Sequence, residues 1–448
     1  MMLAALPLGV GVSLSFAAGL AAGAFVNWAA YSLAWNARPV SPWSAAHPEA
    51  PRRRASDRLP LWGWLNLRRE SSLHGTGFWL RPLAVELAMG LAWAALYWWE
   101  VGRQGLVQPQ LEAILAGGNL AAPHWIVLST FVSHALLLTL MAAASLIDID
   151  EKTIPDGITV PGTLLALVLA AAMPMSLLPH AGLRAVAPVA GAAIPLPAGA
   201  AQQAAPFGLY LEPLTLAAPQ AWPSTLKGAP NVSSLIIGLG CFATWCFALT
   251  PRRWRTRHGW LYGLRVVMAR VARELARPPI LLIALAGAAV IIGVWYLGGP
   301  SWVGLLTALA GMIGGSAMVW AVRIVGSAAL RREAMGFGDV TLMMMIGAFL
   351  GWQPCIFIFF IAPFAGLVAG ILQIVLRRDD VIPYGPFLCL AALVVMVYWG
   401  GLWNAAPGSM QAFFDFPWLV PGMLAFGVLM LGGMLAIWRM VKESFLRQ

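Results

Sequence analysis

The chain has 448 residues, of which 60% are hydrophobic and only 10% are charged, and its formal net charge is +10. A soluble domain carries about 25% charged residues, so this composition excludes an ordinary soluble enzyme and indicates a polytopic membrane protein. Positive charge suggests a nucleic-acid partner only where it forms a patch. Here it lies in the loops between apolar segments, so no nucleic-acid partner is expected.

Eleven apolar segments predict an all-α fold, a polytopic transmembrane helical bundle of about nine to eleven spans. A transmembrane helix needs roughly 20 apolar residues, and the eighth segment is short by that measure. The first segment lacks a basic n-region and a clear cleavage site, so it is expected to remain as a span. The segments cover residues 8–34, 81–100, 124–147, 158–178, 233–250, 280–298, 302–325, 339–351, 354–376, 386–404 and 417–438.

The distribution of Lys and Arg predicts how these spans are oriented. With eleven spans and an outer N-terminus, the basic segments 36–81 and 251–279 fall on one side of the membrane. Only Arg103, Arg184 and Lys227 fall on the other side. Because basic loops stay in the cytoplasm, the chain is predicted to be a multi-pass membrane protein, with the basic face cytoplasmic and with membrane lipids as partners.

Two loops stand out from the pattern of spans. Residues 179–232 are rich in Ala, Pro and Gly and nearly uncharged, so they are expected to form a flexible or loosely packed outer loop. Residues 251–279 combine basic and aromatic side chains, which favours either an amphipathic helix on anionic headgroups or a plain basic loop. The four cysteines form no CxxC pair and the six histidines show no HExxH spacing, so no metal site is expected.

Carboxylates at the mouths of two spans are the most informative residues for chemistry. Asp148 ends the third span and Asp339 opens the eighth, and the predicted parity puts both at the cytoplasmic face. An ionisable group at bilayer depth costs at least ~2.5–3.5 kcal/mol, so by default it marks a functional site. Two carboxylates that share a water form the acid and base of an aspartic protease, because the ionised one takes a proton from the water while its protonated partner hydrogen-bonds the scissile carbonyl.

Residues near both carboxylates receive supporting roles. Gly336 and Gly338 flank the approach to the second carboxylate, and glycine lets a substrate backbone come close. Pro155 suits the first turn of the next helix. Asp156 is expected to cap that helix, and Asp150 to contribute local electrostatics.

Several segments resemble the signature regions of the type IV prepilin peptidases, the GxGD-class aspartic proteases of the bacterial inner membrane. SLIDIDEKTIPDGITVPG (145–162) and EAMGFGDVTLMMMIGAFLGW (333–352) resemble the two catalytic regions. IPYGPF (382–387) is similar to the family's IPFGPF segment, with Tyr384 where that segment has phenylalanine. Shorter similarities to the family's GSFLNV motif and cytoplasmic domain occur at 23–33, 57–68 and 81–87.

The resemblance implies residue roles and an activity. Asp148 and Asp339 match the family's catalytic aspartates, and Gly336 and Gly338 match the glycines of GxGD. The two further acids of the first motif match positions that we would not assign to catalysis. The family cleaves the basic N-terminal leader of prepilins or pseudopilins on the cytoplasmic side, just after a glycine and without a cofactor. Many members then methylate the new N-terminus with S-adenosylmethionine.

The chain departs from the family pattern in its cytoplasmic segment. Residues 36–80 contain no cysteine, so the family's two CxxC pairs are missing and zinc is not expected. Asn27 and Glu86 match the candidate methyltransferase region, which leaves methylation open. Thr341 replaces the lysine that usually follows GxGD. The segment is expected to be held by arginines at the lipid headgroups and by four aromatic side chains, Trp62, Trp64, Phe78 and Trp79.

The aspartates lie further apart in sequence than is usual, and spans six and seven look like an insertion that preserves parity. The predicted regions are 1–100 (N-terminal spans and methyltransferase-like segment), 124–178 (first aspartate), 179–325 (loops and inserted spans) and 326–448 (GxGD and C-terminal spans).

The alternative to a protease is a transporter or channel whose acids relay ions or protons, but such acids would lie within spans rather than at their mouths. A degenerate relative that acts as an assembly scaffold is disfavoured, because both aspartates and both glycines are present.

Overall fold

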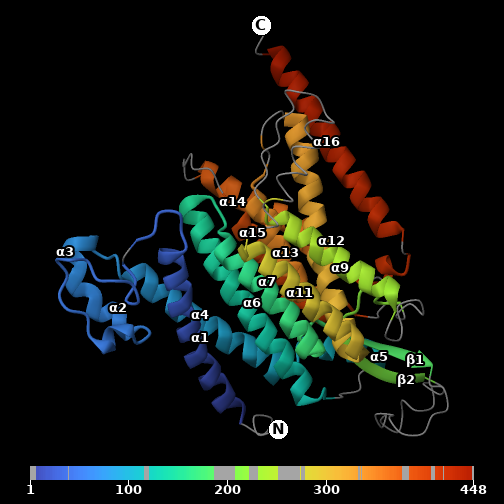
Figure 1. Ribbon diagram of the computed structural model, residues 1–448, viewed down its shortest axis with the longest axis horizontal. Helices are drawn as coiled ribbons and strands as arrows, with labels where there is room; N and C mark the ends of the chain where they lie inside the picture. Colours follow the sequence, from blue (N-terminus) through green and yellow to red (C-terminus); the bar gives the residue numbers. More distant parts are fainter. Residues whose placement is uncertain are drawn as a thin grey trace.

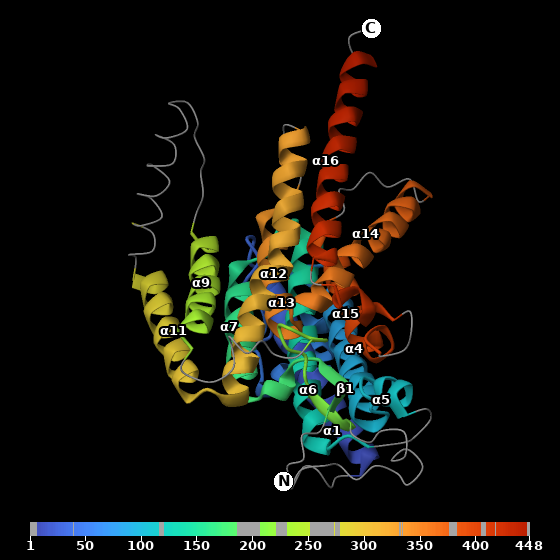
Figure 2. The ribbon, with the colours of Figure 1, turned by 90° about the vertical axis from the view of Figure 1, so that its right-hand side faces the viewer.

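Long apolar helices, packed side by side, make up most of the protein in this computed structural model (Figure 1). A small helical segment lies beside the bundle, and a two-stranded sheet lies at the end of the bundle opposite the C-terminus (Figures 1 and 2). The structure describes residues 7–38, 40–115, 121–185, 207–220, 231–250, 273, 278–330, 333, 335–375, 383–404, 409–416 and 418–445.

Within the described residues, six helices are long and apolar enough to cross a membrane. They are α1 (Leu8–Ser32), α4 with its π-helical continuation η4 (Leu80–Tyr97 and Trp98–Gly102), α6 (His124–Glu151), α11 (Pro278–Leu297), α12 (Gly299–Leu330) and α15 (Gly385–Leu402).

Five further helices have shorter apolar stretches in that part of the chain. They are α7 (Asp156–Ala172), α9 (Val232–Ala248), α13 (Phe337–Leu350), α14 (Trp352–Val375) and α16 (Leu419–Phe445). Together with the six long helices they follow the order of the eleven predicted segments, and the prediction of an all-α polytopic bundle is confirmed.

Helix α13 runs through the interior of the bundle. Every residue from Asp339 to Leu350 is buried, as expected for a helix that is apolar on all sides. It packs on α7, α12 and α15. The backbones of α12 and α13 touch, because a Cβ added at Gly311 would lie 2.2 Å from the carbonyl oxygen of Gly347. This packing holds α13 in the bundle, and Asp339 lies in the first turn of this helix.

A small segment between the first two spans forms the side arm of the molecule. It contains η2 (Ala55–Arg58), α2 (Trp62–Leu67), η3 (Arg68–Glu70) and α3 (Ser71–His74), and lies at the left in Figure 1. Helices α1 and α4, which flank this segment in sequence, pack along each other.

The prediction that residues 179–232 form a flexible or loosely packed outer loop is partly wrong. Strand β1 (Pro179–Ala185) pairs antiparallel with β2 (Phe207–Pro213), from Pro179 opposite Pro213 to Ala185 opposite Phe207. Gln110 Nε2 on α5 (Gln108–Leu115) donates to the Pro179 carbonyl at 3.1 Å, which ties the hairpin to the bundle.

Side chains from elsewhere in the chain complete the packing of this hairpin. His180 is buried, and its Nδ1 accepts a hydrogen bond from Trp403 Nε1 at 2.9 Å. Residues 186–206 and 221–230 of the predicted loop lie outside the described residues, as does most of the predicted amphipathic helix, residues 251–272 and 274–277.

Candidate active site

Asp148 lies in the last turn of α6. The helix ends because Lys152 takes a left-handed backbone conformation (φ 57°), with its amide donating to the Asp148 carbonyl at 2.8 Å. Asp148 is only 4% exposed, and its Oδ2 accepts a hydrogen bond from the backbone amide of Gly385 at 3.1 Å. The carboxylate is therefore fixed by two segments that are distant in sequence, the end of α6 and the start of α15.

Asp339 lies in the first turn of α13, and Gly336 is the N-cap of that helix. The side chain is 7% exposed, and its carboxyl group interacts with the backbone amide of Gly336. Free backbone N–H groups and the helix dipole favour a carboxylate at this end of a helix. The second glycine of the motif, Gly338, packs tightly on Ile154, since a Cβ added to it would lie 3.0 Å from the Ile154 Cβ.

The two aspartates line one pocket of about 530 Å³ although they are far apart in the sequence. Lys152, which follows the first motif, also lines this pocket, and so does Tyr384 of the IPYGPF segment. Two carboxylates in one cavity are the arrangement from which an acid and a base for water activation are built. The sequence-based prediction that Asp148 and Asp339 come together agrees with this geometry.

The IPYGPF segment has roles at this pocket that the sequence reading did not assign. A Cβ at Gly385 would lie 2.5 Å from Asp148 Oδ2 and 2.9 Å from Ile154 Cδ1, so the position leaves no room for a side chain. Burial, and then the charge of Asp339, raise the pKa of Tyr384 to about 12. Its phenol therefore stays protonated at neutral pH and can donate a hydrogen bond into the pocket. Similarity to the family segment was the available signal for both residues.

The other acids of the first motif lie outside this pocket. Asp150 Oδ2 accepts a hydrogen bond from Arg81 Nη1 at 2.9 Å. Asp156 is exposed and is the first residue of α7, where a negative charge favours the helix N-terminus. Pro155 precedes the helix as its N-cap, so the expectation that it occupies the first turn is wrong by one residue.

Asn27 and Glu86 are brought together, but as part of a closed hydrogen-bonded cluster. Both are buried, and Asn27 Nδ2 donates to the Pro82 carbonyl at 2.9 Å and to Glu86 Oε1 at 3.5 Å. Glu86 also accepts hydrogen bonds from Trp64 Nε1 at 2.8 Å and from the Leu61 amide. With both carboxylate oxygens engaged by protein donors, these residues tie α1, α4 and the side arm together.

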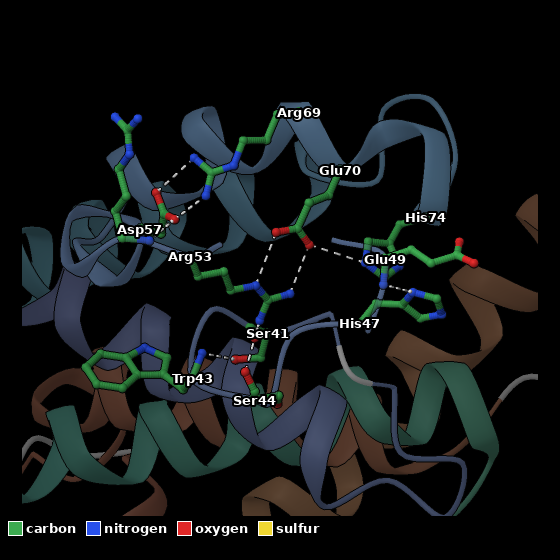
Figure 3. A network of polar contacts seen from close by, with 11 residues as sticks. Ser41, Trp43, Ser44, His47, Glu49, Arg53, Asp57, Arg69, Glu70 and His74 are labelled. Carbon is green, nitrogen blue, oxygen red and sulfur yellow. Dashed lines mark hydrogen bonds and ion pairs between the residues drawn. The ribbon is translucent and has the colours of Figure 1, made fainter. Parts of the chain in front are cut away.

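Ion pairs organise the side arm (Figure 3). Arg53 bonds both oxygens of the buried Glu70, from Nε at 3.2 Å and from Nη2 at 3.0 Å. The Nη1 group of Arg53 donates to the carbonyls of Ser41 and Ser44 at 2.7 and 3.0 Å. Arg69 pairs with the buried Asp57. The prediction that arginines lie at headgroups is therefore wrong for Arg53.

The predicted aromatic contacts of the side arm hold in part. Trp64 is buried, with 1% of its surface exposed, whereas Trp62 is 61% exposed and does not hold the segment. The Arg68 guanidinium lies 5.1 Å from the centroid of the Trp79 ring. Among the described residues, no three His, Cys, Asp or Glu side chains are grouped so that they could hold a metal ion.

Comparison with known proteins finds one family and a set of related proteins. Residues 272–371 match the model of the Type IV leader peptidase family. The matched stretch includes the Gly336–Asp339 motif and the two spans interpreted as an insertion, whereas Asp148 lies outside it.

Three proteins named prepilin leader peptidase/N-methyltransferase are similar to this chain. That of Aeromonas salmonicida (strain A449) is 33% identical over 107 residues, which is 23% of this chain and 36% of that protein. That of Legionella pneumophila is 38% identical over 72 residues, 15% of this chain and 25% of that protein. That of Pseudomonas aeruginosa is 31% identical over 96 residues, 21% of this chain and 33% of that protein.

The matched region spans about a quarter to a third of the length of these curated relatives. No solved structure matches the protein.

Proposed function

Since these matches support the type IV prepilin peptidase family for this chain, we propose that it is a membrane aspartic endopeptidase. Its substrates are the N-terminal leaders of type IV prepilins or pseudopilins, and Asp148 and Asp339 are its catalytic pair. The observation that carries the proposal is that these two buried carboxylates line one pocket. A transporter relay is less well supported, because both carboxylates lie at helix ends, with an open pocket between them.

In the proposed reaction one aspartate is ionised and the other is protonated. The ionised carboxylate takes a proton from a water as the water oxygen bonds to the scissile carbonyl carbon. The electron pair of the carbonyl moves to its oxygen, which takes the proton of the other aspartate. When the carbonyl forms again, a hydroxyl proton of the tetrahedral intermediate returns to the other aspartate, the C–N bond breaks, and the amine leaves with the proton that the first carboxylate took from water. The pair titrates as a unit, so acid and base are not assigned individually.

The proposed location is the bacterial inner membrane, with the pocket at the cytoplasmic face. Six long apolar helices and the family relationship support a multi-pass membrane protein. The Lys and Arg distribution supports the orientation. Reporter fusions after residues 150 and 338 should both report the cytoplasm, and a split between the two sides would contradict the proposal.

Leader cleavage is the direct test of the proposed activity. The full chain is co-expressed with prepilin-like proteins of the same organism, and their N-termini are read by mass spectrometry. We expect the substrate to lose its leader just after a glycine. Substrates that keep their leaders in the presence of the folded, inserted protein would contradict the proposal and favour a transporter or a scaffold.

N-terminal methylation is a second candidate activity, which rests on the names of the relatives. The same mass spectra report it as an added methyl group on the new N-terminus. In this structure the side chains of Asn27 and Glu86 are engaged by hydrogen bonds within the protein.

Gly385→Ala should lower leader cleavage about 10- to 100-fold, because misplacing a catalytic group by about 1 Å has effects of that size. The new methyl group would meet Asp148 Oδ2 and push the carboxylate from its position. Gly401→Ala is the matched control, since Gly401 lies in the same helix and a Cβ there would meet nothing within 4 Å. Similar rates for the two variants would show that Gly385 does not position Asp148.

Tyr384→Phe should lower kcat for cleavage about tenfold and leave KM nearly unchanged. The phenol lines the pocket with both aspartates, and a hydrogen bond from it to the carbonyl oxygen would strengthen as negative charge develops there. The variant keeps the ring and removes only the hydroxyl. An unchanged kcat would show that the phenol does not contact the reacting group.

A further inference from the structure

A second large pocket lies between the side arm and the bundle, away from the aspartates. Its volume is about 590 Å³, and its basic lining residues are Arg38, His47, His74 and Arg81. Among the described residues that line it, there is no Asp or Glu. We call it the basic pocket. A cavity of this size, lined by two guanidinium groups and two imidazole rings, is suited to an anionic ligand.

Residues around the pocket hold three of its four basic groups in place. Arg81 is bonded to Asp150 at 2.9 Å, and His74 Nε2 lies 3.5 Å from Glu70 Oε2. His47 Nδ1 accepts a hydrogen bond from the Glu49 amide, so in a neutral ring Nε2 carries the proton and is a donor. Several positioned donors therefore share one cavity.

The position of the basic pocket indicates where its ligand comes from. Tyr31, in the last turn of α1, and Arg81, in the first turn of α4, both line it, so it lies at the level where two candidate spans end. Trp35 and Trp43 in the adjoining loop are 90% and 54% exposed. Exposed tryptophans and arginines at the ends of spans are typical of the headgroup region of a bilayer.

We propose that the basic pocket binds the phosphate of an anionic phospholipid headgroup. Free inorganic phosphate would offer the same oxygens, but the span ends and exposed tryptophans place the cavity where lipid phosphates are concentrated. S-adenosylmethionine fits less well, because its sulfonium and ammonium groups would face arginines and histidines without a carboxylate in the described lining. The proposal does not depend on the peptidase activity.

The test uses the full chain in nanodiscs that contain equal amounts of phosphatidylglycerol and phosphatidylcholine, with retained lipid counted by native mass spectrometry. The wild type should retain phosphatidylglycerol preferentially. Arg38→Gln should lower that retention about tenfold, the effect of losing one charge-assisted hydrogen bond to the phosphate. Arg52→Gln is the matched control, because Arg52 is exposed, loses the same charge and does not line the pocket.

Two further probes separate the ligand sources. Inorganic phosphate and S-adenosylmethionine are each added to the wild type and to both variants, and the bound ligand is counted by the same native mass spectrometry. Separately, the melting temperature in phosphatidylcholine nanodiscs checks that each variant is folded. Equal losses of phosphatidylglycerol from Arg38→Gln and Arg52→Gln would overturn the proposal in favour of general surface charge. Arg38-dependent binding of inorganic phosphate or S-adenosylmethionine, without a preference for phosphatidylglycerol, would also overturn it.

Discussion

Asp148→Asn and Asp339→Asn should each reduce leader cleavage by about 10³-fold or more, because either change removes one half of the proposed acid–base pair. Asparagine keeps the size of the side chain but can neither take a proton from water nor donate a carboxylic proton. Both side chains are buried in the same pocket, so no other described carboxylate of that lining can replace them. The rate is measured by mass spectrometry of a purified prepilin substrate mixed with each variant.

Asp150→Asn and Asp156→Asn are the matched controls for this prediction. Asp150 pairs with Arg81 and Asp156 lies exposed at the start of α7, so their loss affects local electrostatics by about 0.5–2 kcal/mol. Both variants should cleave within a few-fold of the wild type. A dead Asp150→Asn variant beside an active Asp148→Asn variant would show that the register of the first motif is wrong. Protease resistance of the inserted protein confirms that each variant is folded.

The helices, and the meeting of the two aspartates in one pocket, could be predicted from the sequence because both follow from the pattern of apolar segments and short motifs. Long apolar runs specify helices in lipid whatever their neighbours are, since every backbone group must be satisfied within the segment. The number of predicted spans between Asp148 and Asp339 then placed both residues at the same face of the membrane. The motif around Gly336 and Gly338 identified the second carboxylate. The order of the spans therefore carried most of the information about the pocket.

Interactions between distant segments could not be read in the same way. The amide of Gly385 holds Asp148 across 237 positions of sequence, and no local pattern reports that contact. The β1–β2 hairpin was missed for a similar reason. Its strands look like a flexible Ala- and Pro-rich loop, and they are ordered by Gln110 and Trp403 from other elements.

The side arm shows a further limit of composition. The absence of cysteine in residues 36–80 excluded the family's cysteine-ligated zinc site, but it gave no indication of what holds the segment instead. Arg53 looked like one more surface cation in an arginine-rich stretch, yet it is bonded to Glu70 and to two backbone carbonyls. A charged pair can be recognised as buried only when its surroundings are known.

Arg53→Met should destabilise the side arm by about 3–5 kcal/mol, because it leaves the buried Glu70 without its bidentate partner. Among the described residues, His74, at 3.5 Å, is then the one ion-pair partner left for that carboxylate. Hydrogen exchange of the amides in residues 41–75 measures the local opening free energy. Arg52→Met is the matched control, since it removes the neighbouring charge from an exposed position and should change exchange by less than about 0.5 kcal/mol.

The double variant Arg53→Met/Glu70→Met tests whether the pair itself is responsible. Removing both charges leaves no unpaired ion in the interior, so the double variant should be more stable than Arg53→Met alone. Chelation with EDTA should leave the exchange of the wild-type segment unchanged, because ion pairs hold the described part of the arm where the family uses thiolates and zinc. Stoichiometric zinc in the purified protein, together with faster exchange after chelation, would show that a metal site contributes to the arm. Equal exchange in Arg53→Met and Arg52→Met would show that the Arg53–Glu70 pair does not hold it.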